Sequence, residues 1–240
     1  MGRVPLTFAS YNIHKSVGID RRRDPERIMA VLHEIDADII ALQEVDRRVG
    51  ARETTLSRKD IDDSPWRLVQ VAKRPRSIGW HGNALLVRRS FEVHEGEPLD
   101  LPTLEPRGAA CGEITAHGTR IRVIGTHLDL SGLRRRDQIR SLIGIVDTCR
   151  RDLPTVLMGD FNQWGRATGA MREFAKGWHV ITPGRSYPSR RPIASLDRIC
   201  TTPHWSCMKA HVHHTALSAV ASDHLPVVAT LMLHKEAAAA

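Results

Sequence analysis

Residues 38–45, DIIALQEV, decide the fold of this chain. They form a short apolar run with Glu44 near its end, and a run of this length is typical of a buried strand rather than a helix. Upstream, Asp24 and Pro25 mark a helix start, because Asp is a good N-cap and Pro fits the first helical position. Apolar residues then recur at helical spacing to Ile35, and residues 6–13 alternate weakly as a strand. The chain therefore opens with a predicted strand, helix and second strand.

Downstream of this stretch, short strand-like runs outnumber helices. One amphipathic helix is predicted after Ser131, which we expect to cap it, and a helix near Ala170 interrupts an otherwise irregular segment, 163–190. Residues 46–65 are charged, lack periodicity and predict a long loop. Strands are predicted at 67–72, 83–88, 91–93, 109–116, 120–128, 155–158, 194–200, 207–213 and 225–232. Adjacent strands with so few helices favour an α/β fold of two packed sheets with helices outside over a doubly wound parallel sheet.

Length and composition indicate a soluble globular protein. The 240 residues are 41% hydrophobic and 26% charged, so we expect one domain over residues 1–234 and a disordered tail over residues 235–240. No apolar run reaches the ~18 residues of a membrane span, and the start is too short and polar for a signal peptide. The expected location is therefore cytoplasmic. The four cysteines form no C-x-x-C pair and predict reduced thiols.

The net charge of +8 at pH 7 favours a partner that carries phosphate, such as nucleic acid or an anionic phospholipid. A solvated basic surface explains the same excess equally well. The basic clusters are Arg21–Arg23, Lys73–Arg76 and Arg134–Arg136, each beside turn signals. Trp80 and His81 follow the second cluster and form either a substrate-binding rim or ordinary packing. His211 and His213 share a strand face, so a zinc site with His204 or Cys207 is an alternative that no carboxylate supports.

Polar side chains that carry chemistry stand at the ends of the predicted strands, where sites are usually built. They are Asn12, Glu44, His127, Asp160, Asn162, Asp197, Asp223 and His224. Their wide spacing along the chain is compatible with one site, because packed sheets bring distant strand ends together.

The short motifs around these residues resemble those of the endonuclease/exonuclease/phosphatase superfamily, and among its members the small bacterial YbhP-like type. In chain order they are YNI (11–13), LQEV (42–45), GNALL (82–86), GTHL (125–128), GDFN (159–162), SLDRI (195–199) and SDHLP (222–226). Each motif alone is weak, but seven in the expected order form a specific signature. The resemblance implies a DNase I-like four-layer sandwich, with two mixed β-sheets packed face to face and helices outside.

The same resemblance implies a phosphoesterase that uses Mg²⁺ or Mn²⁺. A phosphodiester is anionic, so catalysis must neutralise charge and stabilise the leaving oxygen, which a hard cation held by carboxylates does. By resemblance Glu44 is the principal metal ligand, Asp223 is a second ligand, and Asn12 lies beside the metal.

The remaining residues take catalytic and substrate-binding roles by resemblance. Asp160 orients or deprotonates the attacking water, and Asn162 donates to a phosphate oxygen. Asp197 and His224 form an Asp–His pair, in which the carboxylate fixes the tautomer of the ring. Either Asp160 or His224 is the general base. His127 is an acid or phosphate donor.

Two residues are expected to bind substrate. Asn83 lies where a partner for His127 is expected, and Arg107 has the forked geometry that suits phosphate oxygens. Nucleic acid is the leading substrate, and a phospholipid or an inositol-type phosphate is the alternative. No stable protein partner is predicted. A non-catalytic binding module would show gaps in the catalytic set, and the sequence shows none.

Overall fold

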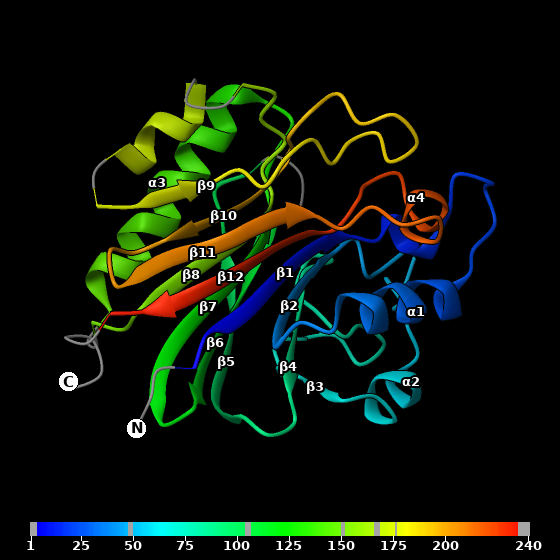
Figure 1. Ribbon diagram of the computed structural model, residues 1–240, viewed down its shortest axis with the longest axis horizontal. Coiled ribbons are helices and arrows are strands. Elements are labelled where there is room, and N and C mark those ends of the chain that lie inside the picture. The colour runs from blue at the N-terminus through cyan, green and yellow to red at the C-terminus, as the bar shows by residue number, and fades with distance from the viewer. Residues whose placement is uncertain are drawn as a thin grey trace.

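Two mixed six-stranded sheets form the centre of the molecule (Figure 1). The computed structural model describes residues 4–47, 50–103, 107–149, 152–165, 169–175 and 177–234, so the predicted tail lies outside the described residues. The first sheet has the order β11-β12-β1-β2-β4-β3 and the second β5-β6-β7-β8-β10-β9. Only the pairs β1–β2 and β7–β8 are parallel. The prediction of two packed mixed sheets is thus confirmed.

The elements have the following bounds. The strands are β1 Leu6–Asn12, β2 Ile39–Gln43, β3 Trp66–Leu68, β4 Ala84–Arg88, β5 Glu92–Asp100, β6 Gly108–Ala116, β7 Thr119–His127, β8 Thr155–Asp160, β9 His179–Ile181, β10 Asp197–Thr201, β11 Trp205–Val212 and β12 Val227–Leu233. The helices are η1 His14–Ser16, α1 Pro25–Ile35, α2 Arg58–Asp62, α3 Gly132–Thr148, η2 Gly169–Ala175 and α4 Ser218–Ala221.

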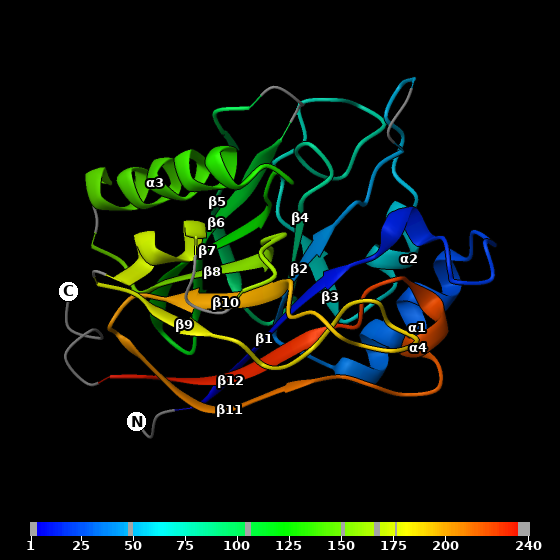
Figure 2. The same ribbon diagram turned by 90° about the horizontal axis from the view of Figure 1, so that it is seen from above.

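The four layers follow from alternation along the strands. Leu6 and Phe8 point from β1 into the apolar cluster between the sheets, while Ala9 and Tyr11 point outward to the cluster under α1. A third cluster joins the outer face of the second sheet to α3 and η2. Accordingly α1 and α3 lie on opposite outer sides of the molecule in both views (Figure 2). Strands buried on both faces explain the continuous apolar runs of the sequence.

Local signals placed the first helix and the hairpin correctly. Asp24 caps α1 by accepting from the Arg27 amide at 3.0 Å, and Pro25 occupies the first turn. The hairpin β6–β7 turns at His117 and Gly118, which both have positive φ as a two-residue turn requires.

Other expectations need correction. Ser131 lies at the N-cap position of α3 but makes no side-chain capping bond. The loop 46–65 contains α2, which Ser57 caps by accepting from the Asp60 amide. No helix in the described part of the chain has both the length and the apolar character to cross a membrane.

Candidate active site

Strand register brings the polar strand ends together. Asn12 pairs with Gln43, the residue before Glu44, in the parallel pair of the first sheet. In the second sheet His127 pairs with Asp160, and Asp160 pairs with Asp197. A hydrogen bond of 3.1 Å from Asn12 Nδ2 to Asp160 Oδ2 then connects the two sheets. One edge of the sandwich therefore gathers residues from both sheets.

Asp160 is the centre of this group. Its carboxylate is 1% exposed, and its Oδ2 lies 3.4 Å from His127 Nε2 and 3.6 Å from His224 Nε2. Its other oxygen, Oδ1, accepts from the backbone amide of Asn162 at 2.9 Å. Because the donor groups converge from three directions, the carboxylate is fixed in place and keeps acceptor capacity toward the site.

Asp197 and His224 form the predicted pair. His224 Nδ1 lies 2.9 Å from Asp197 Oδ2, and the same oxygen accepts from Ser186 Oγ. Burial of the ring opposes protonation, but the carboxylates of Asp197 and Asp160 outweigh it and raise the pKa of His224 to about 10. His224 is therefore an imidazolium at neutral pH.

The ring of His127, in contrast, is neutral at pH 7. Burial lowers the pKa of its ring to about 3, although the Asp160 carboxylate acts against the shift. The two histidines thus face one carboxylate from two sides, one neutral and one cationic. An arrangement of this kind offers a neutral donor and a cationic donor to a bound phosphate and an anionic acceptor to a water molecule.

A left-handed turn supports the part of the site around Glu44. The three residues of η1, His14, Lys15 and Ser16, have φ of 47°, 58° and 58°, and Glu44 has φ of 57°. Non-glycine residues in this region cost on the order of 1 kcal/mol each. The turn is held by bonds from the Lys15 amide to the Glu44 carbonyl at 3.1 Å and from the His14 amide to Asn12 Oδ1 at 3.1 Å.

This turn directs two side chains at the expected metal ligands. Lys15 Nζ forms a close ion pair with Glu44 Oε2. His14 Nδ1 lies 3.9 Å from Asp223 Oδ1, and both side chains are partly exposed. Lys15 and His14 were not predicted from the sequence. A lysine after the YNI motif is a signal that could have been read, but nothing in the stretch HKS predicts positive φ.

The donor chemistry of the site fits a hard divalent cation. Glu44 and Asp223 supply carboxylate oxygens, and the Lys15 ammonium on Glu44 indicates that a positive charge is stable there. Asp160, Asp197 and His224 each offer a ligand atom within 4.8 Å of the others, and the second oxygen of Asp197 is buried without a hydrogen-bond partner among the described residues. Mg²⁺ and Mn²⁺ prefer carboxylate oxygens, and the protonated ring of His224 could not coordinate either ion.

Three predicted residues have the following surroundings in the structure. Asn162 Nδ2 donates to the Leu128 carbonyl at 2.8 Å. Asn83 is fully buried and donates to the carbonyls of Trp80 and Gly108, with no hydrogen bond to His127. Arg107 is partly buried, and its charge contributes to lowering the pKa of His127, behind burial of the ring.

The zinc alternative is not supported by the described residues. His213 Nε2 lies 2.9 Å from Glu34 Oε2, and Thr215 donates to the same oxygen. The one group of potential metal ligands among the described residues is that of Asp160, Asp197 and His224. His211 therefore belongs to the partly buried end of β11, and His213 follows this strand and forms an ion pair with Glu34.

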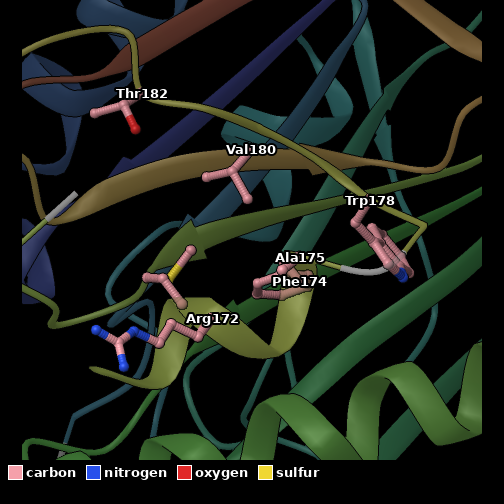
Figure 3. A pocket seen from close by; sticks show the side chains of 7 residues that line it. Arg172, Phe174, Ala175, Trp178, Val180 and Thr182 are labelled. Carbon is pink, nitrogen blue, oxygen red and sulfur yellow. The ribbon is translucent and has the colours of Figure 1, made fainter. Parts of the chain in front are cut away.

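A separate groove lies outside this site, between η2 and β9. It has a volume of about 540 Å³, and Phe174, Trp178 and Val180 line it with Arg172 at one end (Figure 3). Its described lining residues include none of the candidate catalytic or metal-binding residues. The groove is apolar, whereas the chemistry lies at the charged edge of the sheets.

Comparison with known proteins agrees with the motifs. The YbhP protein of Escherichia coli (strain K12), which is uncharacterized, is 28% identical over 208 residues, covering 78% of this chain and 81% of YbhP. TDP2 of D. rerio, solved with a single-strand DNA product, has a TM-score of 0.72 and 15% identity, covering 95% and 98% of the two chains. The mannosyl-6-phosphatase Bt3783 of Bacteroides thetaiotaomicron VPI-5482 has a TM-score of 0.72 and 19% identity, covering 94% and 99%.

The match to a protein family covers most of the chain. The model of the Endonuclease/Exonuclease/phosphatase family matches residues 9–224, a range that contains every predicted site residue from Asn12 to His224. The chain therefore belongs to the endonuclease/exonuclease/phosphatase family.

Proposed function

We propose that this protein is a phosphodiesterase dependent on Mg²⁺ or Mn²⁺, that it acts on nucleic acid in the cytoplasm, and that water attacks the phosphate directly. The observation that carries the proposal is the carboxylate of Asp160, held between Asn12, His127 and His224 at the edge of both sheets. Family membership supports hydrolysis of a phosphate ester, and the DNA product bound to the similarly folded TDP2 supports nucleic acid.

In this proposal Asp160 is the general base that orients the water and accepts its proton. His224 is a poor base, since two carboxylates hold it protonated, and it instead donates to a non-bridging phosphate oxygen. His127 is a neutral donor to the phosphate, and Arg107 and Asn83 belong to the substrate-binding part of the site. A metal ion held by Glu44, Asp223 and Asn12 would neutralise phosphate charge and stabilise the leaving oxygen. Asn162 keeps Asp160 in position through its amide.

The alternative is a phosphatase or phospholipid phosphodiesterase that uses the same residues. The mannosyl-6-phosphatase with a similar fold favours the first of these. Both alternatives keep the roles of Asp160 and His224 and change only the group attached to the phosphate.

The test compares nicking of supercoiled plasmid and hydrolysis of bis(p-nitrophenyl) phosphate, with Mg²⁺ or Mn²⁺ and with EDTA. Asp160→Asn should lower both rates by about 10²–10⁴-fold, the size of a lost general base, in a protein that circular dichroism shows to be folded. Asp152→Asn, at an exposed position, is the matched control and should act as wild type. Hydrolysis of the small diester without nicking would exclude plasmid DNA as a substrate. A folded protein that cleaves neither diester would overturn the proposal.

A further inference from the structure

A group of basic and aromatic side chains lies beside Glu44 and has no role in the mechanism above. We call it the basic rim, and it consists of Arg52, Lys73, Arg74, Trp80 and His81. Lys73 and Arg74 are exposed, and the other three are partly buried. The group comes from two loops, one after β2 and one between β3 and β4.

Contacts within the basic rim give it a defined arrangement. Arg52 Nη1 lies 3.3 Å from His81 Nδ1, and the rings of Trp80 and His81 have centroids 4.3 Å apart. Lys73 Nζ lies 4.6 Å from the centroid of the Trp80 ring. Because a guanidinium can only donate, His81 Nδ1 accepts and the ring proton is on Nε2. The ring therefore keeps a free direction in which it can donate.

The buried carboxylate of Asp46 interacts electrostatically with Arg52 and Arg74 of the basic rim but forms no ion pair with either. Among the described residues no Asp or Glu forms an ion pair with Arg52, Lys73 or Arg74, whereas the neighbouring Arg76 pairs with Glu53. Burial, followed by the charge of Arg52, lowers the pKa of His81 and keeps its ring neutral. Asp100 accepts from Trp80 Nε1 at 3.1 Å.

The basic rim is attached directly to the catalytic group. The carbonyl of Gly82, next to His81, accepts from the Val45 amide, next to Glu44, at 3.1 Å. On the other side a Cβ placed on Gly108 would lie 2.7 Å from the Trp80 ring, so the chain at Arg107 passes against that ring. The rim thus extends from the proposed metal ligand Glu44 toward Arg107.

We propose that the basic rim binds a second phosphate of a single nucleic acid strand, beside the phosphate that is hydrolysed. Three cations and a neutral N–H donor suit a polyanionic backbone, in which phosphates follow one another at short intervals. The inference rests on the proposed function, because it takes the hydrolysed phosphate to lie at Glu44 and Asp160.

A membrane surface fits the basic rim less well. Binding to lipid needs apolar side chains that enter the bilayer as well as positive charge. None of the large exposed apolar residues in the described part of the chain belongs to the basic rim; they are Val4, Ile19, Leu130, Leu133, Trp164, Val180, Ile193 and Met208. A phospholipid with one phosphodiester also has no second phosphate that the basic rim could bind.

The test measures binding of a fluorescent 20-nucleotide oligothymidylate by anisotropy, with Asp160→Asn as the parent protein in Mg²⁺ so that the strand stays intact. The rim variant is Arg52→Gln/Lys73→Gln/Arg74→Gln. Loss of the contacts to this one phosphate should weaken binding at least about tenfold and reduce the slope of log K against log salt by about 0.7. The matched control, Lys59→Gln/Arg172→Gln/Lys209→Gln, removes the same charge from α2, η2 and β11 and should change binding less than about twofold.

Hydrolysis of bis(p-nitrophenyl) phosphate separates this inference from the proposed function. This diester has a single phosphate, so kcat/KM of the rim variant in the wild-type background should stay within about twofold of wild type. Equal weakening in the rim and control variants would overturn the rim as a site, and so would unchanged binding in the rim variant. Rim-dependent binding to phosphatidylglycerol vesicles without oligonucleotide binding would replace nucleic acid by lipid. A wild-type protein that hydrolyses no diester contradicts the proposed function instead.

Discussion

Asp160 shows how much a single carboxylate can determine. Its Oδ2 accepts a hydrogen bond from Asn12 of the first sheet and lies close to His127 and His224. One atom therefore contacts three residues that are far apart in sequence. The charge states of the two histidines follow from how each one is buried and paired. His224 gains two carboxylate neighbours, whereas burial dominates at His127.

These charge states predict two separate histidine titrations in the metal-free protein. His224 should lose its proton as the pH rises through about 10, and His127 should gain one only as the pH falls toward about 3. The pKa of His224 is above its unfolded value of 6.5, so its contribution to stability is complete below pH 6.5 and is lost as the pH rises toward 10. For His127 the sign is reversed, and its contribution is lost as the pH falls below 6.5.

Nuclear magnetic resonance of the ring nitrogens in EDTA measures both titrations. Asp197→Asn should lower the pKa of His224 and leave His127 neutral, because Asp197 contacts only the first ring. Two rings that titrate together near their ordinary pKa would contradict the assigned charge states.

Lys15 leads to a prediction about metal affinity. Its ammonium is paired with Glu44, so a divalent cation must displace it and also bind against its charge. Lys15→Met should therefore tighten binding of Mn²⁺ by about tenfold, equal to ~1.4 kcal/mol, whereas Glu44→Gln should weaken it. Isothermal titration calorimetry measures both, with Lys59→Met on α2 as the control. Weaker Mn²⁺ binding in Lys15→Met would show that the ammonium supports the metal site rather than competing with it.

At the scale of elements, the hairpin β6–β7 carries a buried ion pair. Glu113 and Arg122 face each other in the register, with the Arg122 side chain 3% exposed and Nη2 to Oε1 at 3.0 Å. Burial acts to raise the pKa of Glu113, but Arg122 and Arg120 outweigh it and lower the pKa below its ordinary 4.5. The pair therefore stabilises the fold above about pH 4.5, and this contribution is lost as the pH falls through the folded-state pKa.

Glu113→Gln should consequently reduce the free energy of unfolding by about 3 kcal/mol at pH 7, because it removes the carboxylate that faces the buried guanidinium of Arg122. The cost should shrink at acidic pH, where the wild-type carboxyl is itself protonated. Urea unfolding at both pH values measures it. Glu53→Gln breaks the exposed pair with Arg76 and is the control, with an expected cost below about 1 kcal/mol. Equal costs at both positions would contradict the buried pair.

The elements that the sequence predicted well are those with a strong local signal. Asp24-Pro25 marks the start of α1, and turn residues mark β6–β7. β5 extends well beyond the predicted 91–93, because this edge strand is largely exposed and shows no apolar alternation. α2 was missed although Ser57 and Asp60 have capping spacing, because its five residues are too few for periodicity to appear.

At the scale of the whole molecule, the motifs identified the strand ends but not how they meet. Sequence order says nothing about the bond from Asn12 to Asp160, which exists only when the two sheets are docked. The left-handed turn of η1 was likewise out of reach, since its positive φ values occur without glycine and are held by contacts to Glu44 and Asn12. The pairing of Lys15 with Glu44 depends on that turn.

Docking of the sheets depends on a close approach at Gly125. A Cβ there would lie 3.0 Å from the Cβ of Ala41 and 3.1 Å from Leu85 Cδ2, so a side chain at this point would require these neighbours to move by a few tenths of an ångström. Leu85 is fully buried in the cluster between the sheets. Because the cluster is shared, we expect the two sheets to unfold as one unit.

Leu85→Ala tests this expectation by opening a cavity in the first sheet's half of the shared cluster. It should cost about 2–5 kcal/mol, and hydrogen exchange in increasing urea should show β2–β4 and β7–β8 losing protection at the same, lower concentration. Leu133→Ala, at a side chain that is 77% exposed on α3, should change the midpoint little. A shift confined to the first sheet would mean that the sheets unfold separately. The site would then be lost when the first sheet unfolds, since Asn12 and Asp160 come from different sheets.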